Sequence, residues 1–158
     1  MRYIILALAL FIPLSASAGV AEGLDAISRG NYEEALKQFK PAAERGDAEA
    51  QHLVGVIYRY GRGVKIDHAE AGKWFLMAAK QGNPESQFYL GLMYQNGEGV
   101  KRDLATAHMW LTLSAHNPQT ASRDSLYRQR DVLNLEKRMS EEQIARAKEM
   151  AETWKPVN

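Results

Sequence analysis

Two glycine-rich turns, Gly61-Arg62-Gly63 and Gly97-Glu98-Gly99, are the segments that most resemble a chemical site. Closely spaced glycines can hold a phosphate when they lie between a strand and a helix and are followed by a lysine and a serine or threonine. Here each turn follows a predicted helix, and a Val-Lys pair comes next. We therefore interpret the first glycine of each turn as the left-handed residue that ends a helix, and we predict no phosphate site.

The other residue types that support catalysis are scattered. No two of the four histidines stand four residues apart, and no His-Glu-x-x-His motif occurs, so we predict no metal site and no cofactor. Ser86 and Ser114 occupy small-residue positions without an evident base, which favours packing over a nucleophilic role. The histidines are His52, His68, which follows a helix cap and is expected to be exposed, His108 and His116.

A tandem repeat must position all of these residues. Residues 31–66 align without a gap to residues 67–102, at an offset of 36, with 15 identities in 36 positions. Self-similarity at a period of about 20 to 50 residues is typical of stacked repeats, which present a surface to a partner more often than they house a reaction.

Each unit divides into two amphipathic helices. In the first unit, Asn31 and Glu34 have the spacing of a capping box, Gly46 ends the first helix, and Asp47 caps the second. The second unit repeats this order with Asp67 and Glu70, then Gly82, then Asn83-Pro84. The apolar residues recur at the helical period, which predicts one buried stripe for each helix.

A third unit begins at residue 103 and then departs from the pattern, because Pro118 replaces the expected glycine. Residues 122–137 predict a longer helix, and Ser140 to Gln143 form a capping box that opens a last helix. Together with a short helix over 20–28, these flanks are interpreted as caps, since terminal repeats must shield an apolar face.

The first eighteen residues are typical of an export signal. Arg2 precedes an apolar run over residues 4–12, and Ala16-Ser17-Ala18 is a small-x-small cleavage site that would leave Gly19 as the first mature residue. The run of about ten residues is shorter than the roughly 20 that span a bilayer. An uncleaved membrane anchor is the alternative, whereas a lipoprotein anchor is excluded because the chain has no cysteine.

Length and charge limit the class of protein. The chain has 158 residues, with 20 Lys plus Arg against 19 Asp plus Glu, and removal of the signal takes Arg2 with it. One ordinary domain remains, and its neutral charge argues against nucleic acid as a partner. The absence of cysteine excludes disulfides and thiolate chemistry.

The repeat resembles the Sel-one-like repeat (SLR) family, an α-solenoid related to the tetratricopeptide repeats. Residues 31–115 carry the likeness, and 139–147 look like the C-terminal cap of bacterial members. Gln38 departs from the aromatic residue found at Trp74 and Trp110. The motif reads Ala71-x-x-Trp74-Phe75-x-x-Ala78-Ala79-x-x-Gly82, then Gln87-x-x-Leu90-Gly91-x-x-Tyr94-x-x-Gly97-x-Gly99-Val100.

This resemblance implies an all-α fold: a short right-handed α-solenoid of antiparallel helix pairs, with about two and a half repeats between capping helices. It also implies a non-catalytic adaptor of the bacterial envelope that binds another protein or peptide. The predicted segments are a signal peptide (1–18), an N-terminal capping helix (19–30), repeat 1 (31–66), repeat 2 (67–102), a degenerate repeat 3 (103–138) and a C-terminal capping helix (139–158).

The predicted binding face comes from first-helix positions outside the buried stripe, because such helices line the concave face of tetratricopeptide-like stacks. The face passes from charged to apolar along the array, which suits an amphipathic helix or an extended peptide. In the alternative interpretation, the C-terminal helices cover its apolar part. The predicted binding residues are Lys37, Lys73, Met77, Met109 and Leu113.

Two other functions are kept as alternatives. Some exported relatives with β-lactam-binding activity carry a cysteine pair in each repeat, which suggests a hydrolase that acts on β-lactams or peptidoglycan, although this chain lacks the cysteines. A secreted effector that binds host proteins would differ only in where the mature chain ends up, in the medium or in the periplasm. The sequence does not define the oligomeric state.

Overall fold

The computed structural model describes residues 14–157, and all the secondary structure in this part of the chain is helical. The all-α prediction is therefore confirmed. The apolar run of the predicted signal lies outside the described residues, whereas the predicted cleavage site lies within the first helix. The helices are α1 (Leu14–Ser28), α2 (Tyr32–Glu44), α3 (Ala48–Tyr60), α4 (His68–Lys80), α5 (Pro84–Asn96), α6 (Leu104–His116), α7 (Ser122–Glu136) and α8 (Glu141–Thr153).

Polar side chains cap the helices where the sequence places them. The side chains of Asn31, Asp47, Asp67 and Asn83 each accept a hydrogen bond from a backbone N–H in the first turn of the helix that follows. The complete capping box predicted at Ser140 is confirmed, because Ser140 Oγ accepts from the Gln143 backbone N–H and the Ser140 backbone N–H donates to Gln143 Oε1.

The predicted capping boxes at Asn31 and Asp67 are only half right. The Glu34 carboxylate accepts from the Gln38 side chain instead of turning back to the cap. The Glu70 carboxylate accepts from Trp74 Nε1 at 2.9 Å. Both caps already use their backbone N–H, which donates to a carbonyl of an earlier helix, so the reciprocal bond is not needed.

The glycine turns have the predicted structural role. Gly61 and Gly97 adopt the left-handed conformation, with φ of 62° and 75°, and their N–H groups bond back to Ile57 and Met93. The second glycine of each turn also has a positive φ. A Cβ on Gly99 would lie 2.3 Å from the backbone of His68, so this glycine allows the loop to approach the start of α4.

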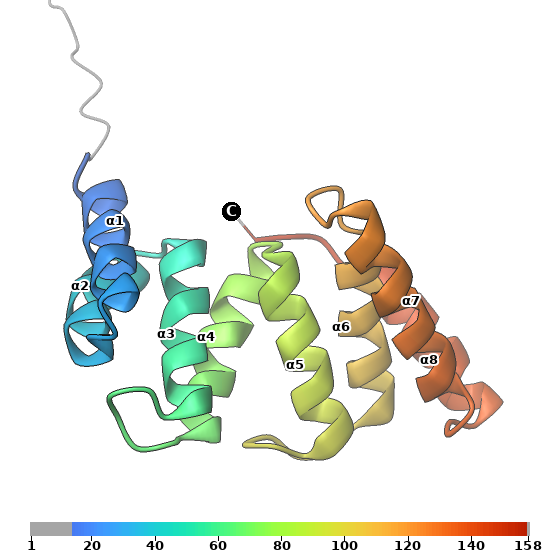
Figure 1. Ribbon diagram of the computed structural model, residues 1–158. Coiled ribbons are helices and arrows are strands. Elements are labelled where there is room, and N and C mark those ends of the chain that lie inside the picture. The colour runs from blue at the N-terminus through green and yellow to red at the C-terminus, as the bar shows by residue number, and fades with distance from the viewer. Residues whose placement is uncertain (1–13, 158) are drawn as a thin grey trace, which may run out of the picture.

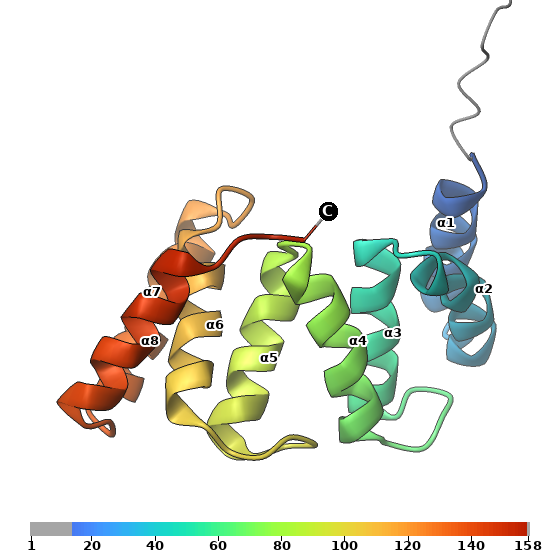
Figure 2. The ribbon, with the colours of Figure 1, turned by 180° about the vertical axis from the view of Figure 1, so that it is seen from behind.

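The helices form two layers in a zigzag. α3, α5 and α7 lie toward the viewer in Figure 1, and α4, α6 and α8 lie toward the viewer in Figure 2. Each helix packs against the next one along the chain as far as α7, while α8 returns to pack against α6. The helices α7 and α8 therefore both pack against α6 and together close the end of the array.

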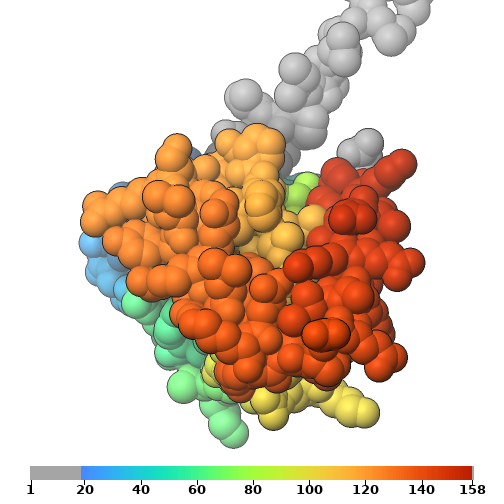
Figure 3. Space-filling model, turned by 90° about the vertical axis from the view of Figure 1, so that its right-hand side faces the viewer, coloured from blue at the N-terminus to red at the C-terminus, as the bar shows by residue number. Residues whose placement is uncertain are grey.

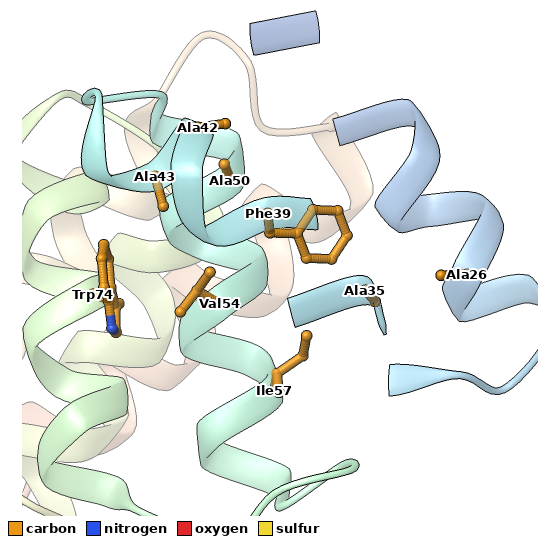
Figure 4. Close-up of a cluster of buried hydrophobic side chains, with 9 residues drawn as sticks. All are labelled: Ala26, Ala35, Phe39, Ala42, Ala43, Ala50, Val54, Ile57 and Trp74. Carbon is orange, nitrogen blue, oxygen red and sulfur yellow. The ribbon is translucent and has the colours of Figure 1, made fainter. Parts of the chain in front are cut away.

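One packing device joins the helices in successive pairs. The ring of Phe75 on α4 lies against Gly55 on α3, where a Cβ would come within 2.7 Å of the ring. Leu111 on α6 is placed in the same way against Gly91 on α5. Phe39 on α2 faces a glycine of α1, Gly23, and belongs to the cluster drawn in Figure 4. The device therefore starts one helix earlier than the repeat that is visible in the sequence.

Candidate functional site

The charged part of the predicted binding face lies at the surface. Lys37 and Lys73 are exposed, but each interacts with a glutamate of its own helix. The hydrogen bond to Glu70, 2.9 Å long, raises the pKa of the Lys73 ammonium. Met77 is 39% exposed. Each lysine thus has a glutamate of its own helix beside it, although both ammonium groups remain exposed to solvent.

The apolar part of that face is covered. Met109 is only 7% exposed, and Leu113 is half-buried. Both pack in one cluster with Met150 and Trp154 at the end of α8. The structure thus has the arrangement of the alternative interpretation, in which a C-terminal helix lies over the patch, and α8 is that helix.

The tryptophans of the repeat pack between helices, as their place in the repeat motif favoured. Trp74 and Trp110 are 7% and 5% exposed. The Trp110 ring meets Trp154 edge to face, with the ring centres 6.1 Å apart. Neither ring offers a free face for a ligand to stack on.

A serine and a histidine come together that the sequence separates by 34 residues. His52 Nδ1 lies 2.9 Å from Ser86 Oγ, and burial lowers the pKa of His52. This is the geometry of a nucleophile and its base, but Ser86 is completely buried beneath α3 and α5. No substrate can reach its hydroxyl in this arrangement, so the pair is a packing contact.

His68 differs from its prediction. It is half-buried at the start of α4, and Nδ1 of its ring is shielded from solvent without a hydrogen-bond partner among the described residues. The cause is the loop after Gly97, because Gly99 brings its backbone against His68.

The most distinctive open feature is a cleft between α5 and α7. Its walls enclose about 310 Å³ and combine aromatic rings with carboxylates. We call it the α5–α7 cleft. It is lined by Glu85, Phe88 and Tyr89 of α5 and by Asp124, Tyr127, Arg128 and Asp131 of α7.

Arg128 forms the floor of this cleft and fastens α7. Its Nη1 donates to Ser114 Oγ at 2.6 Å and to the Pro84 carbonyl at 3.2 Å, and its Nη2 donates to Glu85 at 3.0 Å. The guanidinium also lies 5.1 Å above the Phe88 ring. The charge and the N–H donors of Arg128 are therefore engaged by other groups of this chain.

Negative charge is left over around the cleft. Asp124 and Asp131 form no ion pair with any residue in 14–157. On the neighbouring α3, burial raises the pKa of Glu49, and repulsion by Glu85 and Asp47 adds to that effect.

The basic residues nearby lie on another side. Arg123 and Arg130 of α7 contact the ring of Tyr127, with guanidinium carbons 5.9 and 5.3 Å from its centre. On α7 they stand one helical stripe away from Asp124 and Asp131, on the side of Tyr127. Arg59 lies over the Tyr89 ring and pairs with Glu98 at 3.0 Å.

This cleft was not predicted from the sequence. One half of it could have been found, because Asp124, Arg128 and Asp131 stand at i, i+4 and i+7 in the sequence and so share one face of the predicted helix. The α5 residues that form the other wall could not be predicted, because the repeat does not indicate where a helix outside its pattern will pack.

Two general features bear on the chemistry. Within residues 14–157, no group of three or more His, Asp or Glu side chains is arranged to hold a metal ion. None of the helices described is both long and apolar enough to cross a membrane.

Comparison with known proteins agrees with the packing. The model of the Sel1 repeat matches residues 17–47, 48–83 and 84–117. The chain belongs to the Sel1 repeat family. The family's units begin one helix earlier than the predicted ones, so they pair α1 with α2, α3 with α4, and α5 with α6. These are the pairs joined by the glycine packing device.

Two solved structures have the same fold. One is c5321, a protective antigen present in uropathogenic Escherichia coli strains that displays an SLR fold, with 28% identity and a TM-score of 0.78 over 88% of this chain. The other is a Sel1 repeat protein from Oxalobacter formigenes, with 27% identity and a TM-score of 0.66 over 90% of this chain. This chain spans 29% and 58% of their lengths. No curated protein matches the sequence.

Membership in the Sel1 repeat family sets the class of function. Such repeats are generally protein-interaction modules, and the fold typically serves as a scaffold without catalysis. In the family's units, α2, α4 and α6 are second helices. The predicted binding face assumed that these were first helices. The family's division into units therefore gives no reason to choose their exposed side, which carries Lys37 and Lys73, as the binding face.

Proposed function

We propose that this protein is an adaptor of the bacterial cell envelope that binds a basic segment of another protein in the α5–α7 cleft. The family supports a protein-binding role. The observation that carries the choice of cleft is the pair Asp124 and Asp131, two carboxylates that line it and form no ion pair with any residue in 14–157. A lysine or arginine inserted there would meet both negative charges.

The envelope location rests on the sequence. Residues 1–18 have the features of an export signal. The periplasm is the proposed compartment, and a secreted, host-binding effector is the alternative. Fractionation of cells that express the tagged full-length chain decides between them.

A hydrolase is the less favoured function. Its best candidate pair, His52 and Ser86, is sealed inside the array. Incubation of the purified protein with a β-lactam and with peptidoglycan tests it directly, because turnover that disappears in Ser86→Ala would replace the adaptor proposal.

The face predicted from the sequence is kept as a second candidate in a reduced form. Lys37, Lys73 and Met77 are open to solvent and Leu113 is half-buried, whereas Met109 lies buried beneath α8. Reversal of both lysine charges together with Met77→Glu tests this face. A loss of partner crosslinking with unchanged helical circular dichroism would favour it.

Defined peptides test the cleft. We would measure the fluorescence anisotropy of a labelled Ala-Lys peptide and of an Ala-Glu peptide of the same length. The Ala-Lys peptide is expected to bind, and the double variant Asp124→Asn, Asp131→Asn is expected to weaken it about tenfold or more. Salt should weaken it too, since exposed charges are screened.

The matched control changes the opposite charges on the same helix. Arg123→Gln with Arg130→Gln alters the net charge by the same amount but should leave the binding of the Ala-Lys peptide equal or stronger. Preference for the Ala-Glu peptide, or equal losses in both double variants, would contradict the proposed site. A photo-crosslinker at Tyr127 in intact cells would then identify the natural partner.

A further inference from the structure

Another hollow lies where the loop before α6 meets the first turns of α8, and it encloses about 670 Å³. We call it the α6–α8 hollow. Figure 3 shows that loop, in yellow, beneath the orange and red helices at the end of the chain. Three cations and one carboxylate line the hollow: Lys101, Arg102 and Asp103 come from the loop, and Arg146 comes from α8.

The three cations are exposed and unpaired. Among residues 14–157, none of them forms an ion pair with a carboxylate. Arg102 is held by one bond, in which its Nε donates to the Gln95 carbonyl at 3.2 Å, so both of its Nη groups stay available. Gln143 of α8 adds a neutral donor, because its Oε1 accepts from the Ser140 backbone N–H and its Nε2 is the free end. A ligand in the hollow therefore meets donors that it can reach.

The one carboxylate is already engaged. The oxygens of Asp103 accept hydrogen bonds from the backbone N–H groups of Ala105 and Thr106 and from the Thr106 hydroxyl. Burial acts to raise the pKa of Asp103, but these bonds and the charge of Arg146 together hold it below its ordinary value. Asp103 thus serves the start of α6, and the unpaired charge of the hollow is positive.

The corresponding positions of the preceding repeat carry a different charge. Arg102 stands where that repeat has Ile66, and Thr106 stands where it has Glu70. The third repeat therefore gains a cation and loses a carboxylate at the hollow, and α8 brings Arg146 to the same place. Since the preceding repeat folds without these features, the packing of the repeat does not explain them.

We propose that the α6–α8 hollow binds a small phosphate monoester, whose oxygens accept hydrogen bonds from Arg102, Arg146 and Lys101. Such a group carries close to two negative charges at neutral pH and three acceptor oxygens, so it satisfies more of these donors than one carboxylate can. Tyr94 and Leu104 also line the hollow and give the body of the ester an apolar wall. This site is separate from the α5–α7 cleft, so neither proposal depends on the other.

The test uses phenyl phosphate as the probe. Phenylacetate is its match with a single carboxylate, and inorganic phosphate is its match without the ring. Titration into the ¹⁵N-labelled protein should shift the side-chain amide signals of Gln143 saturably and leave those of Asn134 on α7 unchanged. We expect phenyl phosphate to bind at least about tenfold more tightly than phenylacetate, and inorganic phosphate to bind more weakly than the ester.

Three results of this titration would overturn the proposal. The first is the lack of a saturable shift in the millimolar range. The second is equal affinity for phenylacetate, because the hollow would then not distinguish phosphate from a carboxylate. The third is equal affinity for inorganic phosphate, because the ester would then have no part in the binding.

A double variant places the ligand. Arg102→Ile with Thr106→Glu restores the residues of the preceding repeat, and it should weaken the binding of phenyl phosphate at least about tenfold. The matched control, Arg123→Gln with Arg130→Gln, lowers the net charge by the same amount on α7 and should bind as the wild type does. Asp124→Asn with Asp131→Asn, which alters the α5–α7 cleft, should also leave this binding unchanged.

The comparison of these variants decides the site. Weaker binding in the Arg102 and Thr106 variant alone, with unchanged circular dichroism, supports the α6–α8 hollow. Wild-type affinity in that variant would mean that phenyl phosphate binds elsewhere. Equal losses in that variant and in the α7 control would mean that binding follows the net charge of the protein, and would likewise overturn the proposal.

Discussion

The two tandem units and the C-terminal part of the chain are held together by different means. Over residues 31–102, several contacts occur twice at the same offset, as with Phe39 and Phe75 or the bonds that Gln51 and Gln87 donate to a helix carbonyl. Beyond residue 103, the repeated contacts stop at α7. That helix buries only Arg128 and Leu135, and its far end is tied by a 2.9 Å contact between Glu136 and His108 of α6.

This difference suggests where function lies. The repeated stripes bury apolar side chains against the neighbouring unit, although His68 and Gln87 within them each keep a buried polar atom without a partner among the described residues. Around α7, which buries only Arg128 and Leu135, Asp124 and Asp131 line an open cleft. The α5–α7 cleft thus lies where the repeat gives way to α7.

The largest expected effect concerns the repeated region. Phe75→Ala removes the ring that fills the space against Gly55 and stacks on Tyr89, so we expect a loss of about 3–5 kcal/mol in the free energy of unfolding. Urea denaturation measures it. Leu133→Ala on the exposed side of α7 should stay within about 0.5 kcal/mol. A loss below about 1 kcal/mol for Phe75→Ala would show that the repeat packing is not what holds the array.

Arg128→Met tests the polar fastening. The variant keeps most of the side-chain length but leaves Ser114, the Pro84 carbonyl and Glu85 without their donor, at about 2–3 kcal/mol. Hydrogen exchange should speed up in α7 and stay slow in α4. Arg130→Met, an exposed change on the same helix, is the control. Uniform acceleration along the whole array would contradict the idea that α7 is fastened separately.

Glu136→Gln has a smaller effect that depends on pH. The hydrogen bond with His108, followed by the contact with Lys148, lowers the pKa of Glu136 below its ordinary value of 4.5. Because the folded state favours the charged form, this stabilisation is present above pH 4.5 and is lost as the pH falls through the lowered pKa. We expect the variant to lose about 1–2 kcal/mol at pH 7 and little at about pH 3.

Thermal unfolding at the two pH values measures this difference. Glu149→Gln on the exposed side of α8 is the matched control and should show no such trend. A loss for Glu136→Gln that is the same at both pH values would mean that the carboxylate acts only through its shape.

Glu49→Gln should have the smallest effect and the opposite sign. Burial, followed by repulsion from Glu85 and Asp47, raises the pKa of Glu49, so ionisation of this carboxyl opposes folding above pH 4.5. The variant should gain a few tenths of a kcal/mol at pH 7, since the group is partly exposed and screened, and nothing well below pH 4.5. A loss at pH 7 would show that the carboxylates near the cleft are not in excess.

The helices could be predicted because their signals are local. Asp47, Asn83 and Ser140 satisfy backbone N–H groups within their own first turn, and Gly61 ends a helix through its own φ angle. The first helix of the array was harder to assign to a repeat. Its connection to α2 lacks the Gly-x-Gly turn, and only the contact of Gly23 with Phe39 relates it to the later pairs.

The candidate site could be predicted only in part. Lys37, Lys73 and Met77 are exposed as expected, but nothing along the chain states that α8 folds back over Met109. Likewise, the pairing of Arg128 with Glu85 joins residues 43 apart that belong to different patterns. Such contacts depend on how the last helices dock, for which the repeat holds no template.

The family, and the caps and glycines that bound its helices, follow from the order of residues alone, because they depend on neighbours within a few residues or on the 36-residue repeat. Which surface stays open depends instead on packing between distant segments. The same glutamine is satisfied at position 51 and left with a free acceptor at position 87, because the residue that faces it has changed from Gln81 to Asn117. Local structure depends on residues that are near one another in the chain, whereas a site depends on which distant side chains come into contact in the folded protein.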